Sequence, residues 1–240
     1  MHVGIQGPGR LGRSLAALLV ERGHQVSLIG RGESVPPDCE GLVLTVPDTR
    51  IAEVVAAGLP DLPVLHCSGA QTVDILRPHR PAGSFHPLMT FPGPEVAIPD
   101  LTGVPAVIDG DPEALALATA LAETLDMRVV RVPGDRRLYH AAAVMAGNFA
   151  TVLLAHAAKA LEAAGVPHHE AGGILLPLAV ESLKNAAADP AGSLTGPVAR
   201  GDEAVIASHR QALADIGLSD SLNLYDALTA HTRQLCEGRG

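Results

Sequence analysis

The feature that most constrains the fold is a glycine-rich turn near the start of the chain. A short apolar run, Val3-Gly4-Ile5, leads into Gly7-Pro8-Gly9-Arg10-Leu11-Gly12, and a segment with apolar residues at helical spacing follows. Strand, G-x-G-x-x-G turn and helix in this order indicate a βαβ unit that binds a dinucleotide. Gly7 permits the tight turn, Gly9 lets the backbone approach a pyrophosphate, and Gly12 lets the helix pack close to the strand. The sequence therefore predicts a Rossmann-type domain in which these six residues bind the cofactor.

The second strand of this unit, expected over residues 25–29, indicates which dinucleotide suits the turn. It ends in Gly30-Arg31, where a protein specific for NAD usually places an acid that binds the ribose. Methyltransferases that use S-adenosylmethionine also have a glycine-rich loop after the first strand, but they too generally bind the ribose through such an acid. An arginine at this place suits the 2′-phosphate of NADP, although an exposed loop arginine would have the same sequence. We therefore predict NADP as the cofactor, with NAD less favoured.

Composition and charge argue against several classes of function. With 47% hydrophobic residues among 240, the chain can bury a substantial core. The 17 basic and 26 acidic residues give a net charge of −9 that is spread along the chain, which argues against nucleic acid or an anionic membrane as partner. The three cysteines, Cys39, Cys67 and Cys236, lack metal or redox spacing. From this spacing we expect no metal site, and an odd number of cysteines suits a reducing compartment. No targeting segment precedes the first strand, so we expect a cytoplasmic protein.

Residues 141–158 form a segment that could be mistaken for a membrane span. They carry no formal charge, and about 18 apolar residues are the minimum for a span. The segment contains Asn148, Thr151 and His156, it is rich in alanine, and the whole chain has no tryptophan. These features favour a buried core helix of a soluble protein.

Strand and helix patterns alternate up to residue 133 and give way to helices alone beyond it. In the first part, strands are expected over 3–5, 25–29, 41–46, 63–66, 84–86, 104–109 and 127–132, with helices over 11–22, 48–57, 72–76 and 112–125. In the second part, helices are expected over about 135–164, 167–188, 202–215 and 220–235. Gly172-Gly173 and Pro177 should break or kink the second of these. We predict a doubly wound, mostly parallel sheet in residues 1–133 and an all-α domain for substrate and dimerisation in residues 134–240.

Loops that follow strands hold the first candidate site residues, because a doubly wound sheet binds ligands at the carboxyl ends of its strands. Val46 and Pro47, after the third strand, are expected to contact the cofactor, and Ser68, after the fourth, the substrate. Serine before glycine is also ordinary turn chemistry, so that reading of Ser68 stays open. For Asp48 we favour a helix N-cap over a role in chemistry.

Two histidines are candidates for the reaction. Reduction of a carbonyl by hydride needs a proton donor, and histidine titrates in the useful range. His140 is expected early on the first long helix, and Asn148 follows eight residues later, near the same helix face. We predict catalytic roles for His140 and Asn148 and a substrate contact for His86, although most histidines are ordinary surface or core residues.

The loop at residues 195–202 offers a further substrate contact. It reads Thr195-Gly196-Pro197-Val198-Ala199-Arg200-Gly201-Asp202 and so combines a hydroxyl, a guanidinium and a carboxylate. Arg200, with Thr195 nearby, could bind a substrate carboxylate through a planar fork. Alternatively, Asp202 caps the next helix and Arg200 pairs with it. The sequence favours neither reading.

Several of these motifs together resemble one family. The loop at 195–202, the run Tyr139-His140-Ala141-Ala142-Ala143 with Asn148, and Ser84-Phe85-His86-Pro87-Leu88 are similar to Rossmann-like proteins that carry the domain of unknown function 2520. That family resembles ketopantoate reductases, pyrroline-5-carboxylate reductases and 6-phosphogluconate-type dehydrogenases. The resemblance implies an NAD(P) domain followed by helices that commonly build a dimer, and hence a homodimer through the C-terminal helices.

One departure from these relatives concerns the proton donor. Ketopantoate reductases and hydroxyacid dehydrogenases usually place a lysine four residues before an asparagine on the first long helix. If Asn148 is that asparagine, Val144 occupies the lysine position, and the only lysines are Lys159 and Lys184. Either another group supplies the proton, with His140 as the leading candidate, or the chemistry differs from that of these relatives. We predict an NADPH-dependent reductase of a small carboxylated carbonyl or imine, best a ketopantoate-like 2-oxo acid; the alternative is a non-catalytic NADP-binding sensor or regulatory dimer.

Overall fold

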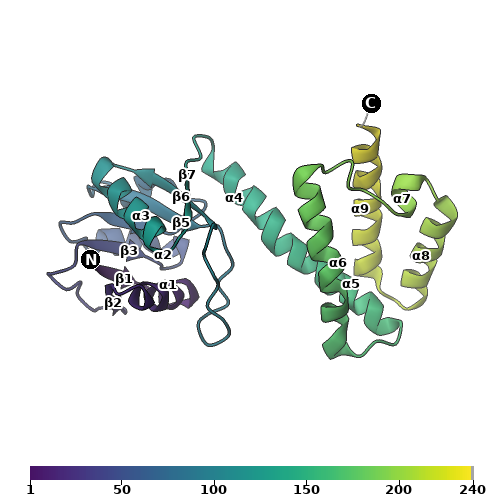
Figure 1. Ribbon diagram of the computed structural model, residues 1–240, viewed down its shortest axis with the longest axis horizontal. Helices are drawn as coiled ribbons and strands as arrows, with labels where there is room; N and C mark the ends of the chain where they lie inside the picture. Colours follow the sequence, from purple (N-terminus) through teal and green to yellow (C-terminus); the bar gives the residue numbers. More distant parts are fainter. Residues whose placement is uncertain (239–240) are drawn as a thin grey trace. The chain divides into compact units, whose positions relative to one another are not determined.

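The computed structural model describes residues 1–238, and the chain divides into two compact units, Met1–Met145 and Ala146–Gly240 (Figure 1). The strands of the first unit are β1 (His2–Gln6), β2 (Gln25–Ile29), β3 (Gly41–Leu44), β4 (Val64–His66), β5 (Ala82–Pro87), β6 (Pro105–Gly110) and β7 (Arg128–Val130). Its helices are α1 (Arg10–Glu21), α2 (Asp48–Ala56), the 3₁₀ helix η1 (Val73–Leu76), α3 (Pro112–Thr124) and α4 (Arg136–Val144). Each strand and helix predicted for residues 1–133 is confirmed, with small differences at the ends.

The strands form one sheet in the order β2-β1-β3-β4-β5-β6-β7. All neighbouring strands are parallel except β5 and β6, which are antiparallel. The predicted mostly parallel sheet is therefore confirmed. Because β1, β3, β4 and β5 run the same way, their carboxyl ends lie at one edge, which is where such sheets bind ligands.

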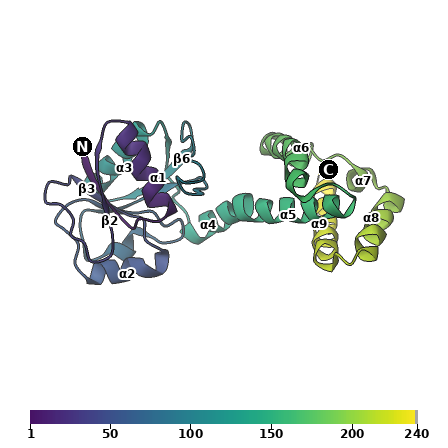
Figure 2. The same ribbon diagram turned by 90° about the horizontal axis from the view of Figure 1, so that it is seen from below.

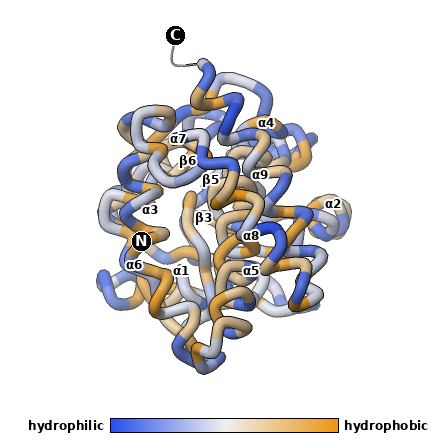
Figure 3. The backbone as a smooth tube through the Cα atoms, turned by 90° about the vertical axis from the view of Figure 1, so that its right-hand side faces the viewer, coloured by the Kyte–Doolittle hydropathy of each residue, from blue (hydrophilic) through white to orange (hydrophobic). Residues whose placement is uncertain are grey.

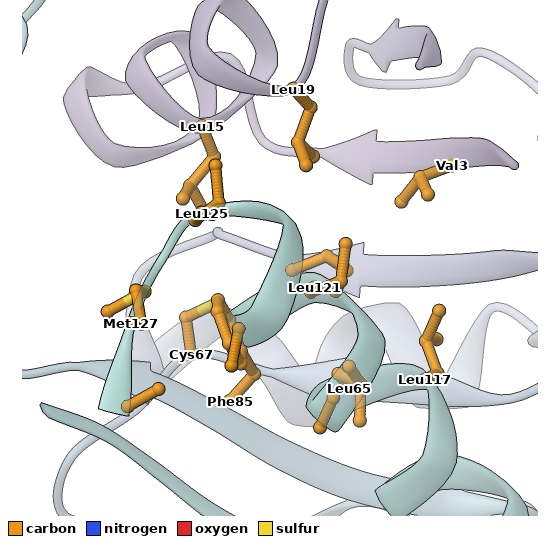
Figure 4. Close-up of a cluster of buried hydrophobic side chains, with 14 of the residues drawn as sticks. Val3, Leu15, Leu19, Leu65, Cys67, Phe85, Leu117, Leu121, Leu125 and Met127 are labelled. Carbon is orange, nitrogen blue, oxygen red and sulfur yellow. The ribbon is translucent and has the colours of Figure 1, made fainter. Parts of the chain in front are cut away.

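Helices cover both faces of this sheet, as Figure 2 shows for α1 and α3 on one side and α2 on the other. The central strands β1, β3 and β4 are buried along nearly their whole length because both of their faces are covered, whereas the edge strands β2 and β7 are partly exposed. Figure 4 shows the larger core cluster, in which Leu15 and Leu19 of α1 and Leu121 of α3 lie against Leu65 and Phe85 of the sheet. On the other face, Ile51 of α2 and the buried residues of η1 pack against β3 and β4. This two-sided core makes the strand-end edge a rigid support.

The second unit contains only helices among its described residues. A π-helical segment, η2 (Met145–Phe149), is followed by α5 (Ala150–Ala163), α6 (His168–Ala188), α7 (Pro197–Arg200), α8 (Glu203–Asp215) and α9 (Ser219–Glu237). Within this unit α5 packs against α6 and α9, and α8 packs against α9. The predicted all-α region is confirmed.

The sequence predicts a break or kink in the second long helix; the break does not occur, whereas the kink stays a prediction. Helix α6 continues through Gly172-Gly173 and Pro177. Proline has no N–H to donate to the carbonyl of the residue four positions earlier, which is Gly173. Both Gly173 and Pro177 are exposed, so water can bond to the freed carbonyl.

The strands end at Val130, close to the boundary expected at residue 133, but the compact units divide after Met145. The difference is helix α4, which the first unit holds. Arg136 at its start donates a hydrogen bond to the carbonyl oxygen of Ser68, and Tyr139 contacts His86. The boundary between the two compact units is therefore set by contacts between residues that are distant in sequence. It does not coincide with the point where the sequence pattern changes from strands and helices to helices alone.

The uncharged stretch at residues 141–158 is not buried within the chain, and the prediction of a buried core helix is wrong for the single chain. The helical run Arg136–Ala163 is long and apolar enough to cross a membrane by length and composition, and none of its most apolar window is buried. In Figure 3 the backbone of α5 carries mostly apolar colours. Helix α5 is apolar on nearly all sides, but α6 and α9 cover only part of its circumference. The rest of its apolar surface is therefore uncovered in the single chain.

Candidate functional site

The glycine-rich turn adopts the conformation that its sequence predicts. Gly7 has a φ of 114°, in the region that favours glycine, and its N–H donates to the Ile29 carbonyl at 3.1 Å. A Cβ on Gly12 would collide with the Gly7 carbonyl and lie 2.6 Å from Oγ1 of Thr45. The close packing of α1 on the turn therefore requires glycine at position 12. The sequence reading missed Thr45, whose hydroxyl donates to the Gly7 carbonyl at 2.7 Å.

Beyond the turn, the start of α1 is open. Within the described part of the chain, a Cβ built on Gly9 would meet nothing within 4 Å, and no side chain caps the helix that begins at Arg10. Pro8 and Arg10 are exposed, and Leu11 is half-buried. The first N–H groups of a helix have no partners inside it, and the helix dipole attracts negative charge. The geometry suits a pyrophosphate, as the sequence predicts.

A pocket of about 260 Å³ lies beside the turn. Five of the predicted cofactor residues line it, namely Gly7, Pro8, Arg31, Val46 and Pro47. Arg50 and Glu53 of α2 line it too, and the sequence reading named neither. The pocket therefore brings together residues from the ends of β1, β2 and β3, as binding of a dinucleotide requires.

An acid does lie at the end of β2, although the sequence reading found none there. The Glu33 carboxylate accepts a hydrogen bond from the Gly30 N–H at 2.6 Å. A turn around Gly32, with a φ of 79°, brings Glu33 back to the strand end. Arg31 is exposed and forms no ion pair within the described residues. Its guanidinium is therefore available to a phosphate, with one carboxylate nearby.

The loop after β4 is held by Ser68. Its hydroxyl donates to Oδ2 of Asp48 at 2.5 Å and accepts from the N–H groups of Ala70 and Gln71 at 3.2 and 3.0 Å. The N-cap position of α2 is Pro47, and no side chain caps that helix. The expected N-cap role of Asp48 is therefore wrong, because its carboxylate accepts the Ser68 hydroxyl instead. The predicted contact between Ser68 and substrate stays a prediction.

Next to this loop lies a cluster of His86, Tyr139 and Arg136. Nδ1 of His86 is 2.6 Å from the Tyr139 hydroxyl, and the two rings meet edge to face. The Arg136 guanidinium carbon lies 5.2 Å from the centroid of the Tyr139 ring. Arg136 is only 7% exposed, and its Nη2 donates to the Ser68 carbonyl at 2.9 Å. The sequence reading missed Arg136, and no local pattern marks it.

The environment of the cluster keeps its histidines neutral. Burial, and then the charge of Arg136, lower the pKa of His86 to about 4, with a smaller effect from His140 and an opposing one from Asp48. The same two main causes lower the pKa of the buried His66, on β4, to about 4. Burial raises the pKa of the Tyr139 hydroxyl, and Arg136 opposes the rise. At neutral pH each of these rings therefore carries no net charge.

The backbone of Gly69 lies between His86 and His140. A Cβ at Gly69 would be 2.9 Å from Nε2 of His86 and 2.7 Å from Cδ2 of His140. The structure therefore brings three predicted residues, Ser68, His86 and His140, around one loop at the carboxyl end of β4. Glycine at position 69 is what allows both rings to approach.

The remaining predicted residues, Asn148, Thr195 and Arg200, belong to the second unit, and all three are exposed. Asn148 lies in the π-helical η2, so the α-helical spacing that related it to His140 does not continue through it. Asp202 caps α8 by accepting from the Val205 N–H at 3.3 Å. No ion pair joins Arg200 to Asp202 among the residues described. The roles of these three residues stay predictions.

Comparisons with known proteins extend over the whole chain. The sequence pattern of the domain of unknown function DUF2520 matches residues 104–232, more than half of the chain. A solved structure of a candidate NADP oxidoreductase from Bacteroides fragilis is 26% identical, with a TM-score of 0.80 over 97% of this chain and 98% of that chain. A protein from Thermotoga maritima is 24% identical, with a TM-score of 0.70 over 98% of both chains. A reductive aminase from Aspergillus terreus, in complex with NADPH and ethyl levulinate, is 16% identical, with a TM-score of 0.71 over 100% of this chain and 95% of that chain. No curated protein matches the sequence.

Proposed function

The chain belongs to the DUF2520 family, whose name states no activity, and we propose from its site that it is an NADP-dependent oxidoreductase. Its substrate is a small carboxylated carbonyl or imine compound, with a ketopantoate-like 2-oxo acid as the leading candidate. The observation that carries this proposal is an open dinucleotide turn and a cluster of proton-bearing side chains at one edge of the sheet. The description of the Bacteroides fragilis protein as a candidate NADP oxidoreductase supports it.

The residues at the turn fit NADP. Gly9 and the uncapped start of α1 would hold the pyrophosphate, and Arg31 the 2′-phosphate. Val46 and Pro47 would line the wall of the pocket. When bound, the reduced cofactor supplies a hydride. The chain itself has to bind and orient the substrate and provide one proton.

The polar cluster of His86, Tyr139 and Arg136 offers side chains that can bind the substrate and provide the proton. It lies at the ends of β4 and β5, on the same edge as the turn that follows β1. On sequence grounds His140 gives the proton and Asn148 orients the reacting group. Ser68, His86 and Thr195 contact the substrate, and Arg200 holds its carboxylate.

A turnover assay tests this function. Purified protein should oxidise NADPH with at least one member of a panel of 2-oxo acids and cyclic imines. His168→Ala, at an exposed histidine that pairs with Glu162, serves as a control and should leave the rate unchanged. Binding of NADPH without turnover on any compound would instead favour the alternative, a non-catalytic NADP-binding sensor or regulatory dimer. Failure to bind NADPH would contradict both.

We also propose that the protein is a homodimer in the cytoplasm, with the interface on the second unit. Large apolar side chains are exposed on η2, α5 and α6: Phe149, Val152, Leu153, Ile174, Leu176, Leu178 and Leu183. Apolar helix faces gain stability when they are covered, and monomeric soluble proteins rarely expose a contiguous patch of this kind. A second copy of the chain offers a matching apolar surface. The three cysteines are free thiols, which suits a reducing compartment.

A further inference from the structure

The described residues hold two histidine–tyrosine pairs of similar geometry, one partly buried and one exposed, and they differ also in a neighbouring arginine. Nδ1 of His86 lies 2.6 Å from the Tyr139 hydroxyl, and Nδ1 of His209 lies 3.0 Å from the Tyr225 hydroxyl. In both pairs the rings meet edge to face, at 88° and 84°. Among the described residues, only the Tyr139 ring has a guanidinium over it, that of Arg136. The second pair therefore shows the same ring geometry at the surface, without a guanidinium beside it.

Arg136 is a buried cation without a carboxylate partner. It is 7% exposed, it forms no ion pair within the described residues, and its one hydrogen bond goes to the Ser68 carbonyl. Its Nε is buried and has no hydrogen-bond partner among residues 1–238. A buried charge of this kind is unfavourable unless negative charge lies beside it. The guanidinium carbon lies 5.2 Å from the centroid of the Tyr139 ring, whose phenol can become negative. Burial lowers the pKa of Arg136, and Tyr139 opposes this lowering more than Asp109 does.

The tautomer of His86 sets the direction of its hydrogen bond with Tyr139. His86 is neutral, so its ring carries one proton, and the Tyr139 hydroxyl is protonated at neutral pH. In the tautomer that carries its proton on Nε2, Nδ1 accepts the hydrogen bond and the Tyr139 hydroxyl donates it. Nε2 is the atom that a Cβ at Gly69 would approach to 2.9 Å, beside His140. The protons thus line up from the phenol, through the imidazole, to the loop after β4.

We propose that Tyr139, His86 and Arg136 form a proton relay that completes the reduction, with Nε2 of His86 as the donor to the substrate. This rests on the proposed function. Hydride brings two electrons to the substrate carbon, and the π electron pair of the C=O or C=N bond moves to the heteroatom. The heteroatom takes the proton of Nε2, and the phenolic proton of Tyr139 moves to Nδ1. The resulting phenolate is stabilised by Arg136, and water restores the phenol after the product leaves. The relay gives His86 the role that sequence grounds gave to His140.

A spectroscopic titration tests the coupling of Arg136 to Tyr139 without cofactor or substrate. The chain has two tyrosines and no tryptophan, so in Tyr225→Phe protein the ultraviolet phenolate signal comes from Tyr139 alone. In this background Arg136→Met should raise the midpoint of phenol ionisation by about one pH unit or more, because it removes a nearby positive charge. Arg136→Lys should keep most of the effect. Asp48, His66, His140 and Asp109 also surround the cluster and are left unchanged. Equal midpoints in the Met and Lys variants would overturn the role of Arg136.

Kinetics test the relay itself. With the substrate found in the turnover assay, Tyr139→Phe and His86→Ala should each lower kcat about 10²-fold or more, with KM little changed. Tyr225→Phe, at the exposed pair, should retain the wild-type kcat, and His140→Ala should lower kcat less than His86→Ala does. A wild-type kcat in Tyr139→Phe, or loss of activity in His140→Ala alone, would overturn the relay and leave the proposed function intact. Absence of turnover in the wild type would overturn both.

Discussion

Gly9 and Gly12 lie in the same turn, but a methyl group would meet different surroundings at the two positions. At Gly12 it would collide with the Gly7 carbonyl and crowd the Thr45 hydroxyl, whereas at Gly9 it would enter open space. One glycine therefore serves packing, and the other leaves room for a ligand. Gly69 also leaves space, in this case for the rings of His86 and His140. The site therefore depends on the lack of a Cβ at these glycines as well as on its polar side chains.

We predict that Gly12→Ala destabilises the protein by about 1–3 kcal/mol, because backbone atoms of the turn have to shift. Gly9→Ala should lose less than about 1 kcal/mol, from a poorer helix cap, but it should bind NADPH more weakly. Urea denaturation measures the free energy of unfolding, and titration calorimetry measures nucleotide affinity. Equal destabilisation in the two variants would contradict the distinction.

At the scale of elements, Asp111 ties the start of α3 to the chain before β5. Its carboxylate accepts from Nη1 of Arg77 at 2.8 Å, Nη1 of Arg80 at 2.9 Å and the Ala82 N–H at 3.0 Å. The hydrogen bond from Arg77, followed by that from Ala82, lowers the pKa of Asp111 from 3.8 to about 2. A lowered pKa means that the folded state favours the ionised carboxylate. Folding is therefore favoured by this group above its unfolded pKa.

That stabilisation should be lost as pH falls from about 4 to 2, because protonation removes the acceptor. We expect Asp111→Asn to have a lower Tm than the wild type at neutral pH and a flatter dependence of Tm on pH across this window. Asp61→Asn, at an exposed carboxylate with no ion pair among the described residues, is the matched control. Thermal unfolding followed by circular dichroism measures both variants. If the Tm of Asp111→Asn depended on pH as steeply as that of the wild type, the stabilising role of the Asp111 carboxylate would be ruled out.

At the scale of the whole molecule, the two units bury their apolar residues to different degrees. The first unit has a continuous core on both faces of its sheet. In the second, α5 has no buried residue, and α6 has one, Ala171. Leu178 and Leu183 of α6 are 69% and 58% exposed. The single chain therefore leaves a large apolar surface uncovered, which is the support for the proposed dimer.

Sedimentation equilibrium at micromolar concentration should give the mass of two chains. Leu178→Glu should shift the protein toward the monomer, because the interface would have to bury an unpaired charge. Val20→Glu, at a 57% exposed position on α1 of the first unit, should leave the dimer intact. A wild-type monomer would contradict the dimer, and a requirement for detergent would point to a membrane partner for the same surface.

The local pattern of the sequence was enough for the strands, the helices and the dinucleotide turn. Hydrophobic periodicity and turn glycines specify a helix, strand or turn through residues only a few positions apart. These elements can therefore be recognised in the sequence without knowledge of the fold. For the same reason Gly7, Gly9 and Gly12 could be placed correctly. The predicted break at Pro177 failed because exposure of the helix face, a tertiary property, decides whether a freed carbonyl finds water.

Only the tertiary structure decided the composition of the polar cluster. Tyr139 meets His86 across 53 positions of sequence, and Arg136 meets Ser68 across 68. The Asp48 carboxylate accepts a hydrogen bond from the Ser68 hydroxyl, 20 positions away, instead of capping its own helix. Hydrogen bonds and charges act over a few ångströms of space, whatever the separation in sequence. The sequence by itself therefore determined which elements form and where the dinucleotide turn lies. Only the folded chain determined which side chains share a proton or a charge, because that depends on which distant residues the sheet brings together.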